Sequence, residues 1–242
     1  MTTFALLHGT WGVPAQWAEV ARHLLFHGDR AIVVDLPIAD PAATLWSCTE
    51  AIERALRGIQ GRVVVVAHSA SGYVATMVPA LRPVDQVVFV SGLVPRPGEP
   101  GVRRRPGRPL SEGTGDLELS PPAFRALMRE QGDGTTTIDP EGLVAFMSVD
   151  PKDPVALSLA KLLRPTASRL FEEPWPLAAL PAVPMSYVVC GQDTVLPPEQ
   201  QRALAARAAA RLVELPEADH AAPLKLPGRI AAALVEIAAR RR

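Results

Sequence analysis

Residues 63–72 of this chain read Val-Val-Val-Val-Ala-His-Ser-Ala-Ser-Gly. Four consecutive β-branched residues predict a strand that is buried on both faces. The strand runs into a turn in which Ser69 has a small residue two positions to either side, Ala67 and Ser71. This layout is typical of a nucleophile elbow, a tight strand-to-helix turn that pushes one serine side chain over the edge of a sheet. The usual elbow has glycine at both small positions, so the match is in size and not in identity.

A second serine in this stretch, Ser71, competes for the role of nucleophile. With Ser71 at the centre of the turn, Tyr73 would occupy a position where the backbone leaves no room for a large side chain. Ser69 is therefore the predicted nucleophile. Taken alone, the stretch fits an ordinary buried strand and turn equally well, because a motif match is only a hypothesis.

Strand-like and helix-like segments alternate along most of the remaining chain. Short apolar runs predict strands at residues 4–7, 31–35, 87–90, 185–190 and 211–215. Apolar spacing and helix-forming composition predict helices at residues 16–26, 44–57, 74–81, 198–210 and 229–240. Such alternation predicts an α/β fold with a mostly parallel, doubly wound sheet and helices on both faces. Ligands of such sheets bind beyond the carboxyl ends of the strands, where His8, Ser69 and Ser91 fall.

The alternation stops in the middle of the chain. Residues 95–122 are rich in Pro, Gly and Arg and predict a loop, in which Arg103, Arg104 and Arg105 form a solvated basic run. Helices are expected at 122–131, 140–146 and 154–163, with a turn and a short extended piece at 132–138. Helices without intervening core strands indicate an insertion. We therefore predict an α/β core formed by residues 1–94 and 176–242, and a cap or lid formed by residues 95–175.

Composition narrows the class of protein. The 25 basic and 25 acidic residues give a formal net charge of +0, which argues against a nucleic-acid partner. No apolar run is long enough for a membrane span, and the N-terminus lacks a signal-peptide pattern. Cys48 and Cys190 are expected to be buried, reduced thiols, which fits the cytoplasm. No Cys/His cluster has zinc-ligand spacing, so no metal site is expected.

Three polar residues follow three strand-like segments in the order Ser69, Asp193, His220. This is the order of a catalytic triad on an α/β sheet. A serine hydroxyl needs a base to become nucleophilic, histidine has a suitable pKa, and a carboxylate orients the imidazole. Asp219 is a rival acid, but its adjacency to His220 favours a turn-forming role. The backbone N–H groups of Thr10 and Ala70 are the expected oxyanion donors.

With these residues the chain resembles the α/β-hydrolase superfamily, and within it the plant methylesterase and hydroxynitrile lyase group with its bacterial relatives. The segments that carry the resemblance are 8–10, 67–72, 159–163, 191–193, 196–201 and 218–220, with Pro227 beyond them. The lyases of that group have a threonine in the first oxyanion loop and a lysine after the catalytic histidine. Gly9 and Ala221 stand at these positions here, and the missing lysine argues against cyanohydrin cleavage.

The resemblance implies a serine hydrolase, of carboxylesterase type, that cleaves a small, largely apolar ester through an acyl-enzyme and needs no cofactor. Membrane and nucleic-acid partners are not expected, and a homodimer stays open. Two alternatives remain: a lyase, acyltransferase or cyclase using the same site, and a ligand-binding receptor on a hydrolase scaffold. Predicted pocket residues are Gly9, Trp11, Phe146, Leu162 and Ala221.

Overall fold

A six-stranded parallel sheet forms the centre of the computed structural model, which describes the chain except residues 101, 104–110, 115–116, 119–120, 148–153 and 241–242. Its strands are β1 (Thr2–Leu7), β2 (Arg30–Val34), β3 (Arg62–His68), β4 (Gln86–Val90), β11 (Met185–Cys190) and β12 (Arg211–Leu215). They lie in the order β12-β11-β4-β3-β1-β2, and every pairing is parallel.

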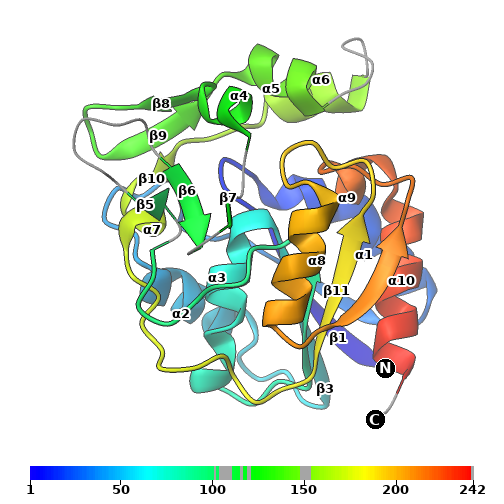
Figure 1. The fold of residues 1–242 in the computed structure, drawn as a ribbon. Coiled ribbons are helices and arrows are strands. Elements are labelled where there is room, and N and C mark those ends of the chain that lie inside the picture. The colour runs from blue at the N-terminus through cyan, green and yellow to red at the C-terminus, as the bar shows by residue number, and fades with distance from the viewer. Residues whose placement is uncertain (101, 104–110, 115–116, 119–120, 148–153, 241–242) are drawn as a thin grey trace.

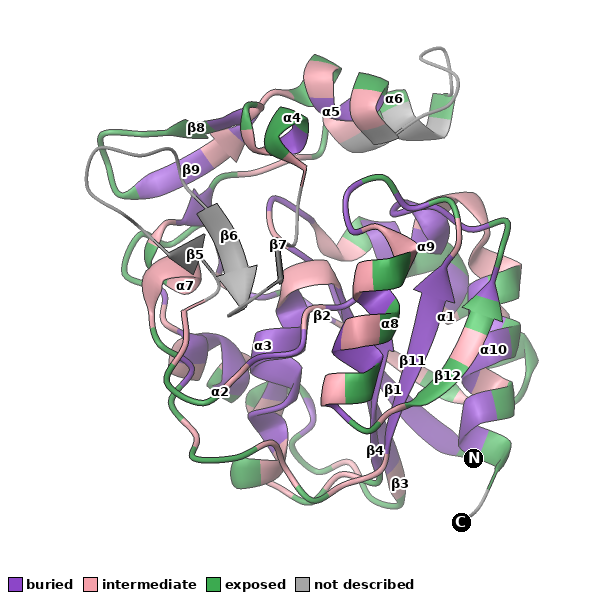
Figure 2. Cartoon of the chain, viewed as in Figure 1, coloured by how far each residue is buried: buried purple, intermediate pink, exposed green. Residues whose placement is uncertain are grey.

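Helices cover both faces of this sheet (Figure 1). On one face lie α1 (Ala18–Phe26) and α10 (Pro227–Ala239). On the other lie α2 (Leu45–Ala55), α3 (Gly72–Ala75) and α8 (Pro198–Arg207). The alternating pleat of the strands separates the two cores, because Phe4 and Leu6 of β1 pack with α1 while Leu7 packs on the other face. Figure 2 shows the inner strands of the sheet buried between partly exposed helices, while the edge strand β12 is largely exposed.

The sheet order creates a crevice at one edge. After β1 the chain moves outward to β2, then returns past β1 to form β3, and continues in the opposite direction through β4. The strand order therefore reverses between β1 and β3. In open parallel sheets this reversal opens a ligand crevice at the carboxyl ends of the strands. The loops after β1 and β3, which carry Thr10 and Ser69, meet at this point.

The segment between β4 and β11 stands apart from the sheet and lies over its carboxyl edge (Figure 1). In its described part, no strand joins the six-stranded sheet. Two small antiparallel sheets are present, β5-β6-β7 and β10-β9-β8. Its elements are β5 (Val102–Arg103), β6 (Ser111–Thr114), β7 (Leu117–Glu118), α4 (Pro122–Arg125), β8 (Met128–Glu130), β9 (Thr135–Ile138), α5 (Pro140–Met147), α6 (Pro154–Ala160), β10 (Thr166–Ala167) and α7 (Arg169–Glu172).

Three local predictions were wrong. The helix expected over 74–81 is two short pieces, α3 and a 3-10 turn at Val78–Ala80, because Pro79 has no N–H for a continuing helix. The helix expected over 122–131 ends at Arg125, after which β8 pairs with β9. The loop expected over 95–122 contains β5, β6 and β7. Of the predicted basic run, Arg103 belongs to β5, while Arg104 and Arg105 lie outside the described residues.

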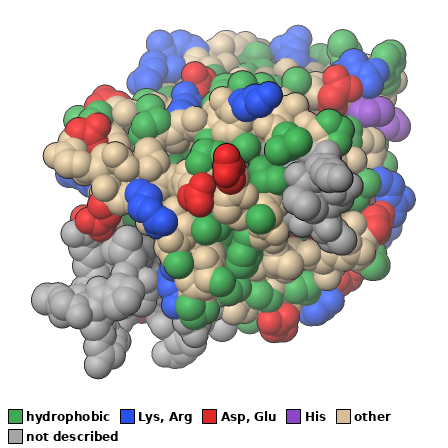
Figure 3. Space-filling view, turned by 90° about the horizontal axis from the view of Figure 1, so that it is seen from above, with side chains coloured by type: hydrophobic (Ala, Val, Ile, Leu, Met, Phe, Trp, Pro, Cys, Tyr) green, Lys and Arg blue, Asp and Glu red, His purple; other side chains and the backbone are tan. Residues whose placement is uncertain are grey.

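The surface carries mixed charge. Figure 3 looks onto the end of the molecule formed by the segment over the sheet, and basic and acidic side chains are interspersed there with hydrophobic ones. Among the residues that the structure describes, no helix is long and apolar enough to cross a membrane.

Candidate active site

Ser69 lies at the turn that follows β3, as the sequence predicts. Its φ of 55° is left-handed, a conformation that costs energy for any residue other than glycine and that concentrates at functional sites. The turn continues as a 3-10 helix at Ser69–Ser71 and then as α3. Glycine is required at Gly72, since a Cβ there would stand 1.9 Å from the Leu93 carbonyl oxygen. This close approach fixes the turn against the end of β4.

Ser71 has a different environment. Its side chain is buried, and its Oγ accepts from the His68 N–H at 3.0 Å and lies 2.8 Å from the His68 carbonyl oxygen. The Leu7 carbonyl oxygen is a further 3.2 Å contact. Both serines border the same cavity, but the Ser71 hydroxyl is buried and engaged by main-chain groups, whereas Ser69 is half-buried.

Asp193 and His220 come together although they follow different strands. Asp193 follows β11, His220 lies in the loop after β12, and Asp193 Oδ2 is 2.7 Å from His220 Nδ1. The Asp193 side chain has no exposed surface, and the His220 side chain is 10% exposed. A carboxylate at Nδ1 fixes the imidazole tautomer with its proton on Nδ1, which leaves Nε2 as the basic nitrogen.

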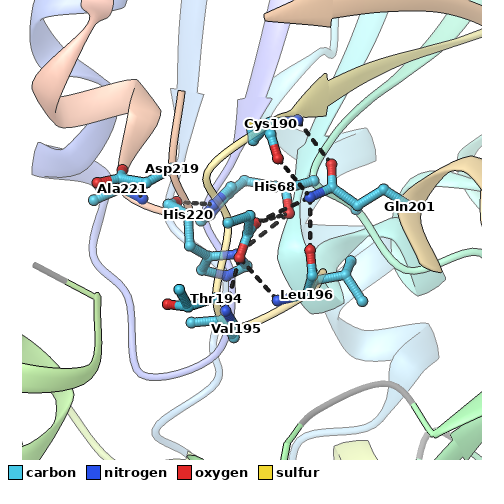
Figure 4. Close-up of polar contacts among 12 residues, drawn as sticks. His68, Cys190, Thr194, Val195, Leu196, Gln201, Asp219, His220 and Ala221 are labelled. Atoms are coloured by element: carbon cyan, nitrogen blue, oxygen red, sulfur yellow. Dashed lines mark hydrogen bonds and ion pairs between the residues drawn. The ribbon is translucent and has the colours of Figure 1, made fainter. Parts of the chain in front are cut away.

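Burial of the Asp193 carboxylate is compensated by several hydrogen-bond donors. The N–H groups of Val195 and Leu196 donate to Oδ1, each at 2.8 Å, and Gln201 Nε2 lies 3.3 Å from Oδ2. Figure 4 shows Val195, Leu196 and Gln201 close to His220, with dashed lines marking the hydrogen bonds of this site. Charge-assisted bonds of this kind offset the cost of removing a carboxylate from water. The acid is therefore held in one orientation toward the histidine.

Ser91 is a residue of this site whose partner the sequence did not reveal. It follows β4, is fully buried and has a left-handed φ of 44°. Its Oγ donates to Asp193 Oδ2, the oxygen that also faces His220. The signal in the sequence was a polar residue at the carboxyl end of a buried strand, but that signal does not identify the partner.

His68, at the end of β3, bonds to two other parts of the site. Its Nε2 donates to the His220 carbonyl oxygen at 2.8 Å, and its Nδ1 lies 3.2 Å from Gln16 Nε2. These contacts match a neutral ring with its proton on Nε2, which donates on one side and accepts on the other. Burial, followed by the effect of nearby His220, lowers the pKa of His68 to about 3. His68 thus ties the loop of His220 to the elbow of Ser69 while staying uncharged.

His8, at the end of β1, is a second buried neutral histidine. Its Nδ1 lies 3.0 Å from the Gly9 carbonyl oxygen, and its Nε2 accepts from the Leu36 N–H at 3.1 Å. Burial lowers the pKa of His8 to about 4, and the nearby Arg164 adds to this effect. These main-chain contacts give His8 a structural role at the end of β1.

The low pKa values of His8 and His68 lead to a prediction of how the free energy of unfolding depends on pH. Because their folded-state pKa values lie below 6.5, the unfolded chain binds protons first as the pH falls. The stability from neutral burial is therefore complete above pH 6.5 and declines toward about pH 4, by roughly 1.4 kcal/mol per pH unit for each ring. Urea unfolding between pH 7.5 and 4.5 measures this slope. A His68→Gln variant, which cannot titrate, is expected to remove about half of the histidine contribution, and an unchanged slope in this variant would contradict the assignment.

A cavity of about 1220 Å³, including its open mouth, lies beside these groups. Ser69, Ala70 and His220 line it, as do Gly9, Thr10 and Trp11 from the loop after β1. No lysine, arginine, aspartate or glutamate is among its lining residues in the described part of the chain. Its other walls include apolar side chains from the sheet side and from the segment over the sheet, namely Leu36, Ile38, Leu45, Cys48, Val74, Leu93, Phe124, Leu143, Leu163, Leu170, Phe171, Val195 and Leu196.

Three of the predicted pocket residues do not line this cavity. Leu162 is 47% exposed, and the neighbouring Leu163 takes the place expected of it. Phe146 lies behind the lining residue Phe124, with 5.5 Å between the ring centroids. Ala221 is buried in the loop after His220. The spacing of residues within a segment did not show which side chain faces the cavity, since this depends on how the segment is placed over the sheet.

Other candidate groups have structural roles. Asp219 Oδ1 accepts from the Ala221 N–H at 2.9 Å and Oδ2 pairs with Lys225 at 2.8 Å, in agreement with the predicted turn-forming role.

Cys48 and Cys190 are buried free thiols, as predicted. Within the described residues, no group of three or more His, Cys, Asp or Glu is arranged to hold a metal ion.

Comparison of the sequence with known protein families agrees with this geometry. Residues 4–233 match the model of the alpha/beta hydrolase family. The chain belongs to this family. This α/β hydrolase is 27% identical to the probable hydrolase R7 of Phoma sp. over 208 residues. The matched region covers 81% of this chain and 79% of that relative.

Solved structures share the fold of this α/β hydrolase. A pyrethroid hydrolase from Sphingobium faniae superposes with a TM-score of 0.79 and 22% identity, over 98% of this chain and 97% of that one. A methylesterase from Arabidopsis gives a TM-score of 0.75 and 18% identity, over 99% of both chains. The predicted fold class and the resemblance to α/β hydrolases are thus confirmed.

Proposed function

We propose that this α/β hydrolase is a serine esterase that cleaves a small, largely apolar carboxylic ester through an acyl-enzyme. The observation that carries the proposal is the 2.7 Å contact between Asp193 and His220, at a cavity that the left-handed Ser69 also lines. A buried acid, a histidine and a strained serine at the reversal point of the sheet form a nucleophile with its base and its orienting group.

Each residue has one part in the proposed reaction. Ser69 Oγ attacks the ester carbonyl while His220 Nε2 takes its proton. Asp193 holds His220 Nδ1 and stabilises the imidazolium that forms. The tetrahedral intermediate collapses, and His220 returns the proton to the alcohol oxygen as the ester bond breaks. Water, deprotonated by the same histidine, then releases the acid and restores Ser69. The scheme requires no metal or organic cofactor.

The negative oxygen of the intermediate needs fixed donors, and we assign the N–H groups of Thr10 and Ala70. Both residues line the cavity. Ala70 stands in the first turn of a 3-10 helix, where backbone N–H groups have no partner within the helix. Gly9 lets the loop pass the nucleophile, since a Cβ there would lie 2.9 Å from Ser69 Cβ. Such donors typically supply the largest electrostatic contribution to acyl transfer.

Residues 95–175 are the proposed cap over this site. Trp11 and Val195 of the core share one apolar cluster with Phe124, Ile138 and Leu143 of this segment. The cavity lies between this cluster and the apolar cluster of the sheet. An apolar substrate group would fill the space between the two clusters, which favours an apolar ester over a polar one.

The absence of charged side chains from the described cavity lining predicts selection for neutral esters. Moving a carboxylate into an apolar cavity without a partner costs several kcal/mol. The kcat/KM for p-nitrophenyl butyrate is therefore expected to exceed that for the mono-p-nitrophenyl ester of succinate by about 100-fold or more. The two substrates match in chain length and leaving group, so the charge is the main difference.

Release of p-nitrophenol by the purified protein measures both values. No turnover of the neutral ester would overturn the proposed function. Equal kcat/KM values for the two esters would overturn the apolar substrate class and leave the esterase assignment standing.

A further inference from the structure

One loop of the proposed active site is held by main-chain and side-chain contacts from the proposed cap. This loop, residues 9–12, carries the proposed oxyanion donor Thr10. Its own hydrogen bonding is weak, with a single Gly12 N–H to Gly9 carbonyl bond at 3.3 Å. It also contains Trp11, a non-glycine residue with a left-handed φ of 55°. A conformation of this kind persists only where surrounding contacts hold it.

Trp11 receives those contacts from the cap. Its N–H donates to Thr166 Oγ1 at 2.8 Å, and its carbonyl oxygen accepts from the Arg164 N–H at 3.0 Å. Its indole Nε1 donates to the Thr136 carbonyl oxygen at 3.1 Å. Trp11 is 4% exposed, so water offers little substitute for these partners. The backbone of the loop is thus bonded on both sides to residues 164–166.

The Arg164 side chain extends this connection to the ends of two strands. Its Nε donates to the Gly12 carbonyl oxygen at 2.9 Å. Its Nη2 donates to the Leu36 carbonyl oxygen at 3.0 Å and lies 2.9 Å from His8 Nε2. The same nitrogen pairs with Asp35 at 2.5 Å. The planar guanidinium suits several acceptors held in a fixed arrangement, which a lysine ammonium could not reproduce.

We infer that Arg164, together with Thr166, is a positioning residue that sets the oxyanion loop of this hydrolase. The inference rests on the proposed function, because it concerns the donor assigned to Thr10. Arg164 is not among the described residues that line the cavity, so its effect on the substrate is indirect. The cap then does more than cover the site. Loss of the contacts from Arg164 and Thr166 would release the loop that carries the proposed oxyanion donor.

The experiment uses two variants and two matched controls. Arg164→Gln removes the guanidinium, and Thr166→Val replaces the buried acceptor of the Trp11 N–H by a methyl group of similar size. Thr166→Ser keeps that acceptor. Arg169→Gln removes a cap arginine whose ion pair, with Glu173, does not involve the loop. Hydrogen exchange of the amides of residues 10–12 reports the loop directly, and p-nitrophenyl butyrate hydrolysis reports its consequence.

In both test variants, the amides of residues 10–12 are expected to exchange at least about tenfold faster while those of β1 stay unchanged. The kcat is expected to fall about 10- to 100-fold with KM within about threefold, because loss of one oxyanion donor costs up to 100- to 1,000-fold in a protease precedent. Both controls are expected to stay within about twofold of the unmodified protein.

Unchanged exchange in both test variants would overturn the inference. Faster exchange with unchanged kcat would also overturn it, since the loop would then have no bearing on the reaction. If the unmodified protein hydrolysed no ester, the proposed function would fail instead, and the exchange measurement would still decide whether Arg164 holds the loop.

Discussion

Replacing Ser69 with alanine is expected to lower kcat for p-nitrophenyl butyrate by about a millionfold, a loss of the size seen when a protease loses its serine nucleophile. The two other serine hydroxyls near this turn have partners of their own, because Ser91 donates to Asp193 and the Ser71 hydroxyl is committed to main-chain contacts. The fold should survive, because Ser69 is half-buried and alanine removes one oxygen. Steady-state kinetics, with circular dichroism to confirm folding, measures the loss.

Covalent labelling separates Ser69 from its neighbour. A fluorophosphonate should modify the unmodified protein at Ser69, identified by fragment-ion mass spectrometry, and should not label Ser69→Ala. The Ser71→Ala variant is the matched control. It should lose some stability, because the His68 N–H loses its partner, but it should still be labelled. A folded Ser71→Ala protein that resisted labelling, or an active Ser69→Ala protein, would show that the nucleophile is misassigned.

Replacing Asp193 with asparagine is expected to lower kcat by about 10,000-fold, as the equivalent change does in a serine protease. The asparagine would fill the same space and keep its oxygen toward the N–H groups of Val195 and Leu196. Its amide nitrogen would then face His220 Nδ1 and donate to it. The imidazole would carry its proton on Nε2, where it cannot accept the proton of Ser69.

Asp219→Asn is the matched control for this prediction. Asp219 is adjacent to His220 in the sequence, but its carboxylate bonds to the Ala221 N–H and to Lys225. Its kcat is expected to stay within about threefold of the unmodified protein, and its labelling by fluorophosphonate should be retained. If Asp219→Asn were the more damaging change, the acid of the triad would have to be reassigned.

Much of the core was predictable because its signals are local. The four valines of β3 alternate between the two faces of the sheet, with Val64 and Val66 on one side and Val63 and Val65 on the other. An apolar run ended by a small-residue turn therefore specifies both the strand and the elbow. Asp193 and His220 were predictable for a related reason, since parallel strands bring their carboxyl ends to one edge.

The remaining contacts depend on residues far apart in sequence. Arg164 contacts His8 and Gly12 only when the proposed cap is folded over the sheet. No periodic pattern in the sequence indicates these contacts. Ser91 and Gln201 are unremarkable polar residues until the packing of β4, β11 and α8 brings them to Asp193. In the cap, strands of two to four residues give too little repetition for a pattern, so β8 was mistaken for the end of a helix.

The order of strands in the sheet also bears on how the protein is made. The proposed nucleophile follows β3, while its proposed partners Asp193 and His220 follow β11 and β12, which come later in the sequence. Without β11 and β12, Ser69 would have neither partner, and its hydroxyl would have the reactivity of an ordinary alcohol. The proposed activity would begin only when β11 and β12 join the sheet beside β4. A chain that ends before β11 is therefore expected to show no esterase activity.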